Sequence, residues 1–387
     1  MHHKRLLLIN SRFLPLIGGG ETYILELIST FIGRGWEVHL ATNHNGYDKE
    51  EWNGCKIHYV DGFNDDRLRL WECMPDLRRI LDRVKPDLVH VHNIMPFFTY
   101  ANVIDKHEFP TVLTIHNTPN LPHRIFGTLR NYEAERAFVR QLLANGRYDK
   151  LTVGSQYYLD SYLKVTPWIR DRAEVIYFFP AQLNQGPFTP HSIQNKKYFK
   201  LLFPSRIAER KGIIDVIEVL SRLPSTFTLL VPSFAADEQK DPTCRRHVNL
   251  LIDSLGIRDR IEIPDKPVPP EEMASYYKAA DIVLIPSHYE GFGIAAVEAM
   301  SWGVPVIASD VGGLREIFTD TFDGLLIPPN NTQALRRAIL QLAENTTLYK
   351  NIANNETKTV QERFSRNMHM KRITQVYEEV LRKYNKL

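Results

Sequence analysis

Short apolar runs alternate with helix-length segments along almost the whole chain of 387 residues, and this alternation limits the fold more than any other feature. Apolar runs of about four to six residues suit strands buried on both faces, and parallel strands of that kind are joined by helices. Helical patterns lie between them, at 21–33 and in the stripe Leu77, Ile80, Leu81 and Val84. The expected strands are residues 5–9, 37–42, 56–60, 87–91, 111–115, 150–153, 174–177, 199–204, 227–231, 260–263, 282–285 and 304–308.

The alternation breaks once, between residues 179 and 197. This stretch carries Pro180, Pro187 and Pro190 and has no apolar periodicity, so it is typical of a linker. The two βα sets on either side indicate an α/β protein of two Rossmann-like domains, whose parallel sheets we expect to face a central cleft. The expected boundaries are 1–180 for the amino-terminal domain, 181–198 for the linker, 199–364 for the carboxy-terminal domain and 365–387 for a final helix.

Composition excludes several classes of protein. A chain that is 43% hydrophobic and 24% charged is globular, and a net charge of +3 excludes a polybasic nucleic-acid arm. The three cysteines lie far apart, which argues against a disulfide framework or a zinc ribbon. The first apolar run, Leu6–Ile9, is too short for a signal peptide, and no stretch reaches the roughly 20 apolar residues that cross a bilayer. We therefore expect a cytoplasmic protein without a nucleic-acid partner.

The most informative stretch is 286–305, where a strand ends, a glycine-spaced loop follows and a helix begins. Backbone N–H groups at the start of that helix favour an anion such as a diphosphate. Glu298 lies one turn into the helix among apolar residues, where a carboxylate needs a hydrogen-bonding partner such as ribose hydroxyls. Glu290, in the loop, is placed to reach the hydroxyls of a sugar. The alternative is an exposed glutamate on a helix with an ordinary cap. The donors at the helix start belong to Phe292, Gly293 and Ile294.

Two cations follow the first strand of the second half. Arg206 lies just past the end of that strand and Lys211 opens the next helix, so both should project into one crevice. Two fixed cations suit the oxygens of a diphosphate and would stabilise the charge on a departing nucleotide. Alone, such residues are more often solvated surface. Their combination with the loop at 290–298 favours the functional interpretation.

Two weaker signals lie in the first half. The glycines at 18–20 let backbone amides approach a ligand, although an ordinary strand–helix turn explains them equally well. They do not form G-x-G-x-x-G, so a nicotinamide site is not supported. His90, His92 and His116 lie near the ends of two expected strands, with His90 and His92 on the same side of theirs. His116 suits a hydrogen bond to a sugar or a satisfied strand end. No carboxylate spacing supports a metal there, and we expect none.

Together these residues resemble the retaining glycosyltransferases of family 4, which have the two-domain GT-B fold. The resemblance covers nearly the whole chain. The residues Glu290 and Glu298 correspond to the family's Glu-x7-Glu motif, and Arg206 and Lys211 stand where the family clamps a diphosphate. His116 stands where the family carries a histidine beside the transferred sugar. Further correspondences are 18–21, 34–38, 311–317 and 323–326.

The resemblance implies transfer of a hexose-type sugar from a nucleotide-diphosphate sugar to a hydroxyl acceptor, with retention and without a metal or other cofactor. A UDP-sugar is the first choice of donor and a GDP-sugar the second. Arg206 and Lys211 would stabilise the leaving diphosphate, and Glu290 and His116 would fix the sugar. The final helix would cross back over the first domain. The donor-binding residues implied are Gly19, Gly20, Ile263, Phe292, Gly293, Ile294 and Glu298.

Three segments depart from the family pattern, at 176–180, 203–206 and 264–266, and the last bears on the choice of nucleobase. The alternatives are a nucleotide-sugar epimerase or phosphorylase of the same architecture, and a non-catalytic sugar or lipid head-group binding protein. The intact cation and carboxylate positions favour the transferase. The stretch 123–143 mixes arginines with apolar residues, which suits weak peripheral contact with an anionic membrane, an anionic acceptor, or plain amphipathic packing.

Overall fold

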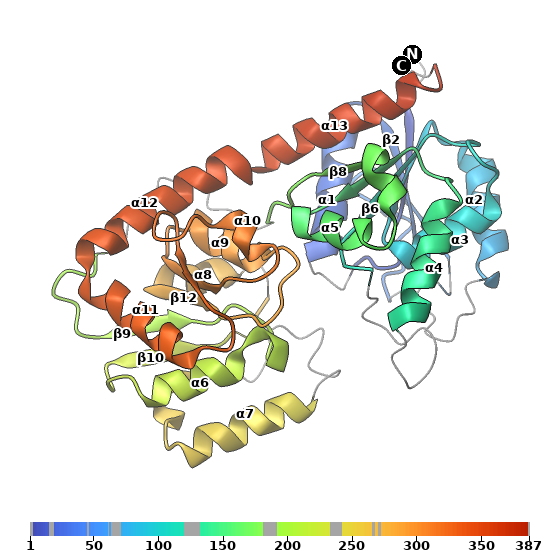
Figure 1. The fold of residues 1–387 in the computed structure, drawn as a ribbon. Helices are drawn as coiled ribbons and strands as arrows, with labels where there is room; N and C mark the ends of the chain where they lie inside the picture. The colour runs from blue at the N-terminus through green and yellow to red at the C-terminus, as the bar shows by residue number, and fades with distance from the viewer. Residues whose placement is uncertain are drawn as a thin grey trace. The chain divides into compact units, whose positions relative to one another are not determined.

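The structure, a computed structural model, describes residues 3–14, 19–44, 46–60, 62, 71–119, 132–180, 192–232, 242–264, 268–269 and 272–385. The chain divides into two compact units (Figure 1). The first unit comprises Met1–Tyr177 and Asn367–Leu387, and the second comprises Phe178–Arg366. The expected linker falls mostly on residues 181–191, which lie outside the described residues. Each unit has its own sheet and its own core.

The described part of the first unit contains an eight-stranded sheet in the order β3-β4-β2-β1-β5-β6-β7-β8. All neighbouring pairs are parallel except the antiparallel pair β3·β4. The sequence pattern did not predict β3, a two-residue strand that turns back through Asn53 and Gly54, both with positive φ. The strands are β1 (Arg5–Ile9), β2 (Glu37–Thr42), β3 (Glu51–Trp52), β4 (Cys55–Tyr59), β5 (Leu88–His92), β6 (Thr111–Ile115), β7 (Lys150–Val153) and β8 (Ala173–Val175).

Helices pack against this sheet and bury apolar side chains there. On α2 the buried residues are Leu77, Ile80, Leu81 and Val84, the stripe expected from the sequence. The last helix packs on the first unit, where Tyr377 stacks on Phe31 at 4.7 Å between ring centroids. The helices are α1 (Gly19–Ile32), α2 (Met74–Val84), α3 (Ile94–Val103), α4 (Tyr132–Ala144), α5 (Gln156–Leu163) and α13 (Arg366–Arg382), and a 3-10 helix spans Pro167–Arg172.

The second unit contains, among its described residues, a six-stranded parallel sheet in the order β11-β10-β9-β12-β13-β14. The sequence pattern missed β14, whose three residues lie between Gly324 and two prolines. The strands are β9 (Phe199–Leu202), β10 (Phe227–Leu230), β11 (Ile261–Glu262), β12 (Ile282–Ile285), β13 (Val306–Ser309) and β14 (Leu325–Ile327).

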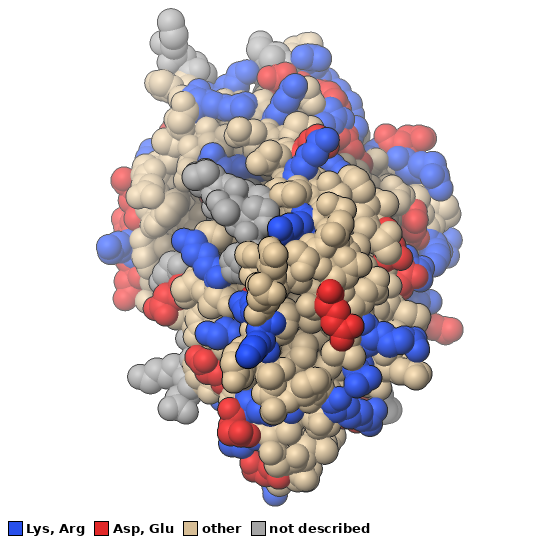
Figure 2. Space-filling view, turned by 90° about the vertical axis from the view of Figure 1, so that its left-hand side faces the viewer, with Lys and Arg blue, Asp and Glu red and all other residues tan. Residues whose placement is uncertain are grey.

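Helices α6 and α11 lie side by side in this unit, and α9 lies against α12 (Figure 1). The helices are α6 (Ile213–Ser221), α7 (Pro242–Ser254), α8 (Met273–Ala279), α9 (Ile294–Ser301), α10 (Leu314–Ile317), α11 (Thr332–Glu344) and α12 (Thr346–Arg363), with 3-10 turns at Glu209–Lys211 and Arg258–Arg260. The α/β class with two parallel sheets is thus confirmed. On the face shown in Figure 2, Lys and Arg lie interspersed with Asp and Glu. Within the described residues, no helix is both long and apolar enough to span a membrane.

Candidate active site

The second unit carries two loops at the carboxyl ends of neighbouring strands. Strand β9 is followed by the loop 203–212, and β12 is followed by the loop 286–293. From β9 the chain continues to β10 on one side, whereas β12 lies on the other side, so the strand order reverses between β9 and β12. Ligands of open parallel sheets bind at such a reversal, just beyond the strand ends. Among the residues that the sequence singled out, these two loops hold Arg206, Lys211, Glu290, Phe292 and Gly293.

Lys211 and Glu290, which belong to the two different loops, form an ion pair. The distance between Lys211 Nζ and Glu290 Oε2 is 2.5 Å, and Ser287 Oγ donates to the same carboxylate oxygen at 3.3 Å. The two charged side chains keep only 13% and 14% of their surface exposed. Shielding from water strengthens the attraction between them. An ammonium has three N–H donors, so Lys211 can hold Glu290 and still donate to an incoming anion.

Arg206 lies close to this pair and is half-buried. Burial lowers its pKa, the positive charge of Arg210 lowers it further, and the negative charge of Glu290 opposes both effects. An arginine remains charged under such conditions. The two positive charges of Arg206 and Lys211 therefore outnumber the single negative charge of Glu290. A half-buried excess of positive charge at the end of a strand is suited to binding an anion.

Glycines let the two loops approach each other and the helix α9. At Gly212, with φ of 77°, a Cβ atom would lie 2.2 Å from the carbonyl oxygen of Pro286. At Gly293, with φ of 113°, a Cβ would lie 2.7 Å from Leu314 Cδ2. Gly293 is also the N-cap of α9, so the first N–H groups of Ile294–Ser301 point out of the helix end, where a helix favours a negative charge. The backbone N–H of Gly313 fixes the carbonyl of Glu290 at 3.1 Å.

Glu298 lies half-buried on α9, and its carboxyl accepts a hydrogen bond from a tyrosine on the neighbouring α8. The distance from Tyr277 Oη to Glu298 Oε2 is 2.9 Å. Burial raises the pKa of Glu298 to about 7, and the bond from Tyr277 opposes the rise. Both protonation states are therefore populated near neutral pH. One oxygen of the carboxyl is held by Tyr277 and the other can meet a ligand hydroxyl. Sequence reasoning did not find Tyr277, because nothing in its apolar helix marks it.

His116 lies at the end of β6 in the first unit. Its Nε2 is 3.2 Å from His92 Nδ1, and its backbone N–H donates to Asn93 Oδ1 at 3.1 Å. Burial lowers the pKa of His116 to about 4, so the ring is neutral at physiological pH. His90 and His92 lie on the same face of β5, with ring centroids 4.1 Å apart. Both are fully buried, and His90 is bonded at 2.6 Å to Tyr377 Oη and at 2.6 Å to Thr114 Oγ1.

The other predicted donor-binding residues lie in separate places. Gly19 and Gly20 begin α1 in the first unit, while Gly18 lies outside the described residues. Ile263 follows the edge strand β11 and packs on the core of the second unit; in the described part of the chain, no hydrogen bond or ion pair links it to Lys211 or Glu290. Residues 265–267 lie outside the described residues, as do 123–131 of the amphipathic stretch. In the portion that the structure describes, no three His, Cys, Asp or Glu side chains could hold a metal ion.

The chain has two α/β units with parallel strands, and one of them gathers cations and carboxylates at its strand reversal. This combination is typical of enzymes that transfer sugars. Residues 17–178 match the family described as Glycosyltransferase Family 4, and residues 188–359 match the one described as Glycosyl transferases group 1. A D-inositol 3-phosphate glycosyltransferase from Xylanimonas cellulosilytica is 38% identical over 338 residues, covering 80% of this chain and 79% of that protein. The chain therefore belongs to the family 4 glycosyltransferases.

Solved structures show the same fold at low sequence identity. A sucrose-phosphate synthase from Thermosynechococcus elongatus superposes with a TM-score of 0.81 at 22% identity, covering 98% of this chain and all of that one. The Anabaena protein HepE, in complex with UDP and glucose, gives a TM-score of 0.77 at 19% identity, covering 97% of this chain and 100% of that one. These neighbours establish the GT-B fold. The protein is a glycosyltransferase, as its sequence predicted.

Proposed function

We propose that the protein transfers a hexose-type sugar from a UDP-sugar, or next from a GDP-sugar, to a hydroxyl acceptor with retention at the anomeric carbon. The observation that carries the proposal is the shielded pair of Lys211 and Glu290, with Arg206 beside it, at the strand reversal of the second unit. The complex of HepE with UDP and glucose supports the choice of donor. The Glu-x7-Glu resemblance supports retention.

In this proposal the reaction depends on stabilising a departing diphosphate. The bond between the anomeric carbon and the diphosphate oxygen breaks, the acceptor oxygen bonds to the same face, and the acceptor proton passes to the departing diphosphate. Negative charge therefore grows on the diphosphate, where Lys211, Arg206 and the N–H groups at the start of α9 lower the barrier. These cations supply what a bound metal would supply in other transferases, so we propose that no metal is needed.

The remaining residues would orient the donor. Glu290 would accept hydrogen bonds from sugar hydroxyls, and Glu298 from the ribose, with the oxygen that Tyr277 leaves available. The resemblance assigns neutral His116 to the transferred sugar, which suits a ring that both donates and accepts a hydrogen bond. No protein side chain acts as a nucleophile in this scheme.

A nucleotide screen tests the proposal first. UDP, GDP and ADP, and their glucose conjugates, are added to the protein and the melting temperature is measured; a ligand that binds the folded state raises it. We expect the largest rise with a uridine nucleotide, and its loss in Lys211→Ala. If no nucleotide stabilises the protein, the proposal is wrong. Incubating the preferred donor without an acceptor then separates the classes, because an epimerase converts it whereas a transferase hydrolyses it slowly.

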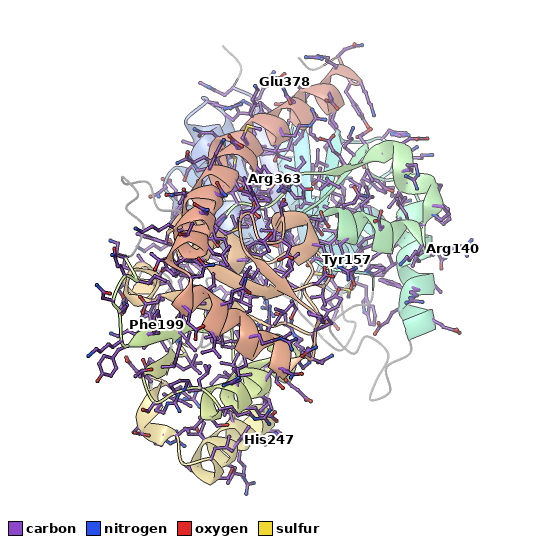
Figure 3. The ribbon with its side chains drawn as sticks, turned by 60° about the vertical axis from the view of Figure 1, so that its left-hand side comes forward. Arg140, Tyr157, Phe199, His247, Arg363 and Glu378 are labelled. Atoms are coloured by element: carbon purple, nitrogen blue, oxygen red, sulfur yellow. The ribbon has the colours of Figure 1, made fainter. Side chains whose placement is uncertain are left out.

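For the location we propose the cytoplasm, since the buried thiols Cys55, Cys73 and Cys244 suit a reducing compartment. Weak peripheral contact with the inner face of the cell membrane stays a prediction. It concerns α4, where the guanidinium of Arg140 (Figure 3) lies 5.4 Å from the ring centroid of Trp168, a residue that is 45% exposed. Sedimentation with anionic vesicles tests it, with Arg140→Glu as the variant expected to reduce binding.

A further inference from the structure

A hydrogen-bonded pair of side chains that the proposed reaction does not use lies close in sequence to Lys211 and Glu290. His288 Nε2 is 2.7 Å from Asp215 Oδ2, and the two side chains are 29% and 19% exposed. His288 belongs to the loop after β12, two residues before Glu290. Asp215 belongs to the first turn of α6, four residues after Lys211. The pair therefore links the Glu290 loop to the helix that directly follows the Lys211 loop, in addition to the link between Lys211 and Glu290.

His288 makes another bond to the Lys211 loop through its backbone. Its N–H donates to the carbonyl oxygen of Arg210 at 2.9 Å. Arg210 directly precedes Lys211, and Asp215 follows it in the next helix, so His288 holds the chain on both sides of Lys211. Its ring can donate to Asp215 in the neutral Nε2–H tautomer and in the protonated form, so the bond does not depend on one charge state.

The turn that carries Lys211 needs such outside contacts. Glu209–Lys211 is a single 3-10 turn, which ends at Gly212 in the left-handed conformation. A turn of this length has few hydrogen bonds of its own, so contacts with neighbouring segments determine its position. Lys211 also ends in a long flexible side chain. An ammonium group is effective only when its support holds it within about 0.5 Å of the productive position.

We propose that His288 is a positioning residue. Its bonds to Asp215 and to the carbonyl of Arg210, here called the bracket, hold the Lys211 turn next to the Glu290 loop. Lys211 and Glu290 are thereby already in place when the diphosphate of the donor arrives. The inference rests on the proposed function of Lys211. Preorganisation of this kind increases affinity, because the cost of ordering the side chain is met before the ligand arrives.

The folding of the second unit does not depend on the His288 contacts. Helix α6 is anchored by its fully or almost fully buried residues Ile213, Val216 and Ile217, which do not depend on His288. His288 itself is partly exposed, so its truncation leaves no buried cavity. His288→Ala should therefore fold with a melting temperature near that of the wild type. His247→Ala is the matched control, because His247 is exposed on α7 of the same unit, as labelled in Figure 3.

The first experiment compares the dissociation constants of UDP and UMP by calorimetry. The bracket acts on Lys211, which in this proposal contacts the second phosphate. His288→Ala should therefore raise the dissociation constant of UDP by about 10-fold and change that of UMP by less than about 2-fold. His288→Gln keeps a hydrogen-bond donor and Asp215→Asn keeps an acceptor, so each variant should retain most of the affinity for UDP. His247→Ala should change neither. A loss of structure would weaken the binding of UDP and UMP by similar factors, and that result would overturn the proposal.

A second measurement needs no nucleotide. Reductive methylation of Lys211 Nζ, followed by mass spectrometry, reports how tightly Glu290 holds the ammonium. We expect His288→Ala to raise the labelling rate of Lys211 about 10-fold relative to the other lysines, with no change in His247→Ala. If the labelling rate of Lys211 is unchanged in His288→Ala, the proposal is wrong regardless of the nucleotide affinities. The proposed function fails by a different result, which is that Lys211→Ala leaves the preference for UDP over UMP intact.

Discussion

Glu356, on α12, is a fully buried carboxyl whose environment favours its neutral form. Its Oε1 accepts the backbone N–H of Val306, the first residue of β13, at 2.9 Å. Its Oε2 has no hydrogen-bond partner among the described residues. Burial raises the pKa of this carboxyl well above its usual range, the nearby Asp323 raises it further, and the bond from Val306 opposes the rise. We therefore expect the carboxyl to be neutral in the folded protein at physiological pH.

The sign of the pH effect follows from this proton. In the unfolded chain a glutamate ionises near pH 4.5, so above that pH the folded state binds one proton more than the unfolded state. The free energy of unfolding must then fall as pH rises, by about 1.4 kcal/mol per pH unit until the pKa of the folded state is reached. From pH 4.5 to 7 the loss is about 3 kcal/mol. For a unit of this size that corresponds to roughly 6–12 °C in melting temperature.

Glu356→Gln removes the titration and keeps the shape and the acceptor for Val306. We expect the variant and the wild type to unfold at similar temperatures at pH 4.5, and the variant to be more stable by roughly 6–12 °C at pH 7. Scanning calorimetry is the assay, because it can resolve the transitions of two units. Glu362→Gln, an exposed position on the same helix, is the control and should show no such pH dependence. A difference that is the same at pH 4.5 and pH 7 would refute the reasoning.

Three further results are expected. Lys211→Ala and Glu290→Gln should each lower turnover at least about 100-fold at an unchanged melting temperature, measured with the donor that the nucleotide screen selects; a drop under about 3-fold in both contradicts their assignment. Gly293→Ala should cost about 1–3 kcal/mol in calorimetry, because of its φ of 113° and the contact with Leu314, whereas Gly256→Ala, with open space around it, should cost about 1 kcal/mol. Burial lowers the pKa of His369 to about 4, so its neutral ring should cost about 3 kcal/mol of stability as pH falls from 6.5 to 4, and His369→Asn should flatten that profile.

The strands were predictable because a parallel strand buried on both faces leaves a plain apolar run. The strands at 5–9, 37–42, 111–115, 150–153 and 282–285 have the predicted ends. The hairpin strand β3 was missed although Asn53-Gly54 is a strong turn signal, because its two residues carry no alternation to detect. The contact between Lys211 and Glu290 could be anticipated in kind, since both residues follow strands and such strand ends gather at one edge of a sheet.

The partners of the site residues could not be predicted from the sequence. Tyr277 and Glu298 lie on different helices 21 residues apart, and His288 and Asp215 lie 73 residues apart. Which side chains meet across such distances depends on helix rotation and loop path, which no local pattern records. The bond between His90 and Tyr377 spans 287 residues, because it exists only where α13 packs on the first unit. The roles of Ile263, Gly19 and Gly20 stay predictions from the resemblance.

The buried titratable groups give the two units opposite responses to pH. In the first unit His116 and His369 are neutral because burial lowers the pKa of each to about 4, so acid destabilises this unit as the rings take up protons. In the second unit burial raises the pKa values of Glu298 and Glu356, so this unit loses stability as pH rises. The separation between the two calorimetric transitions should therefore change steadily with pH, with the second unit gaining relative to the first on acidification. Parallel shifts of both transitions would mean that the units unfold as one body or that these groups are solvated.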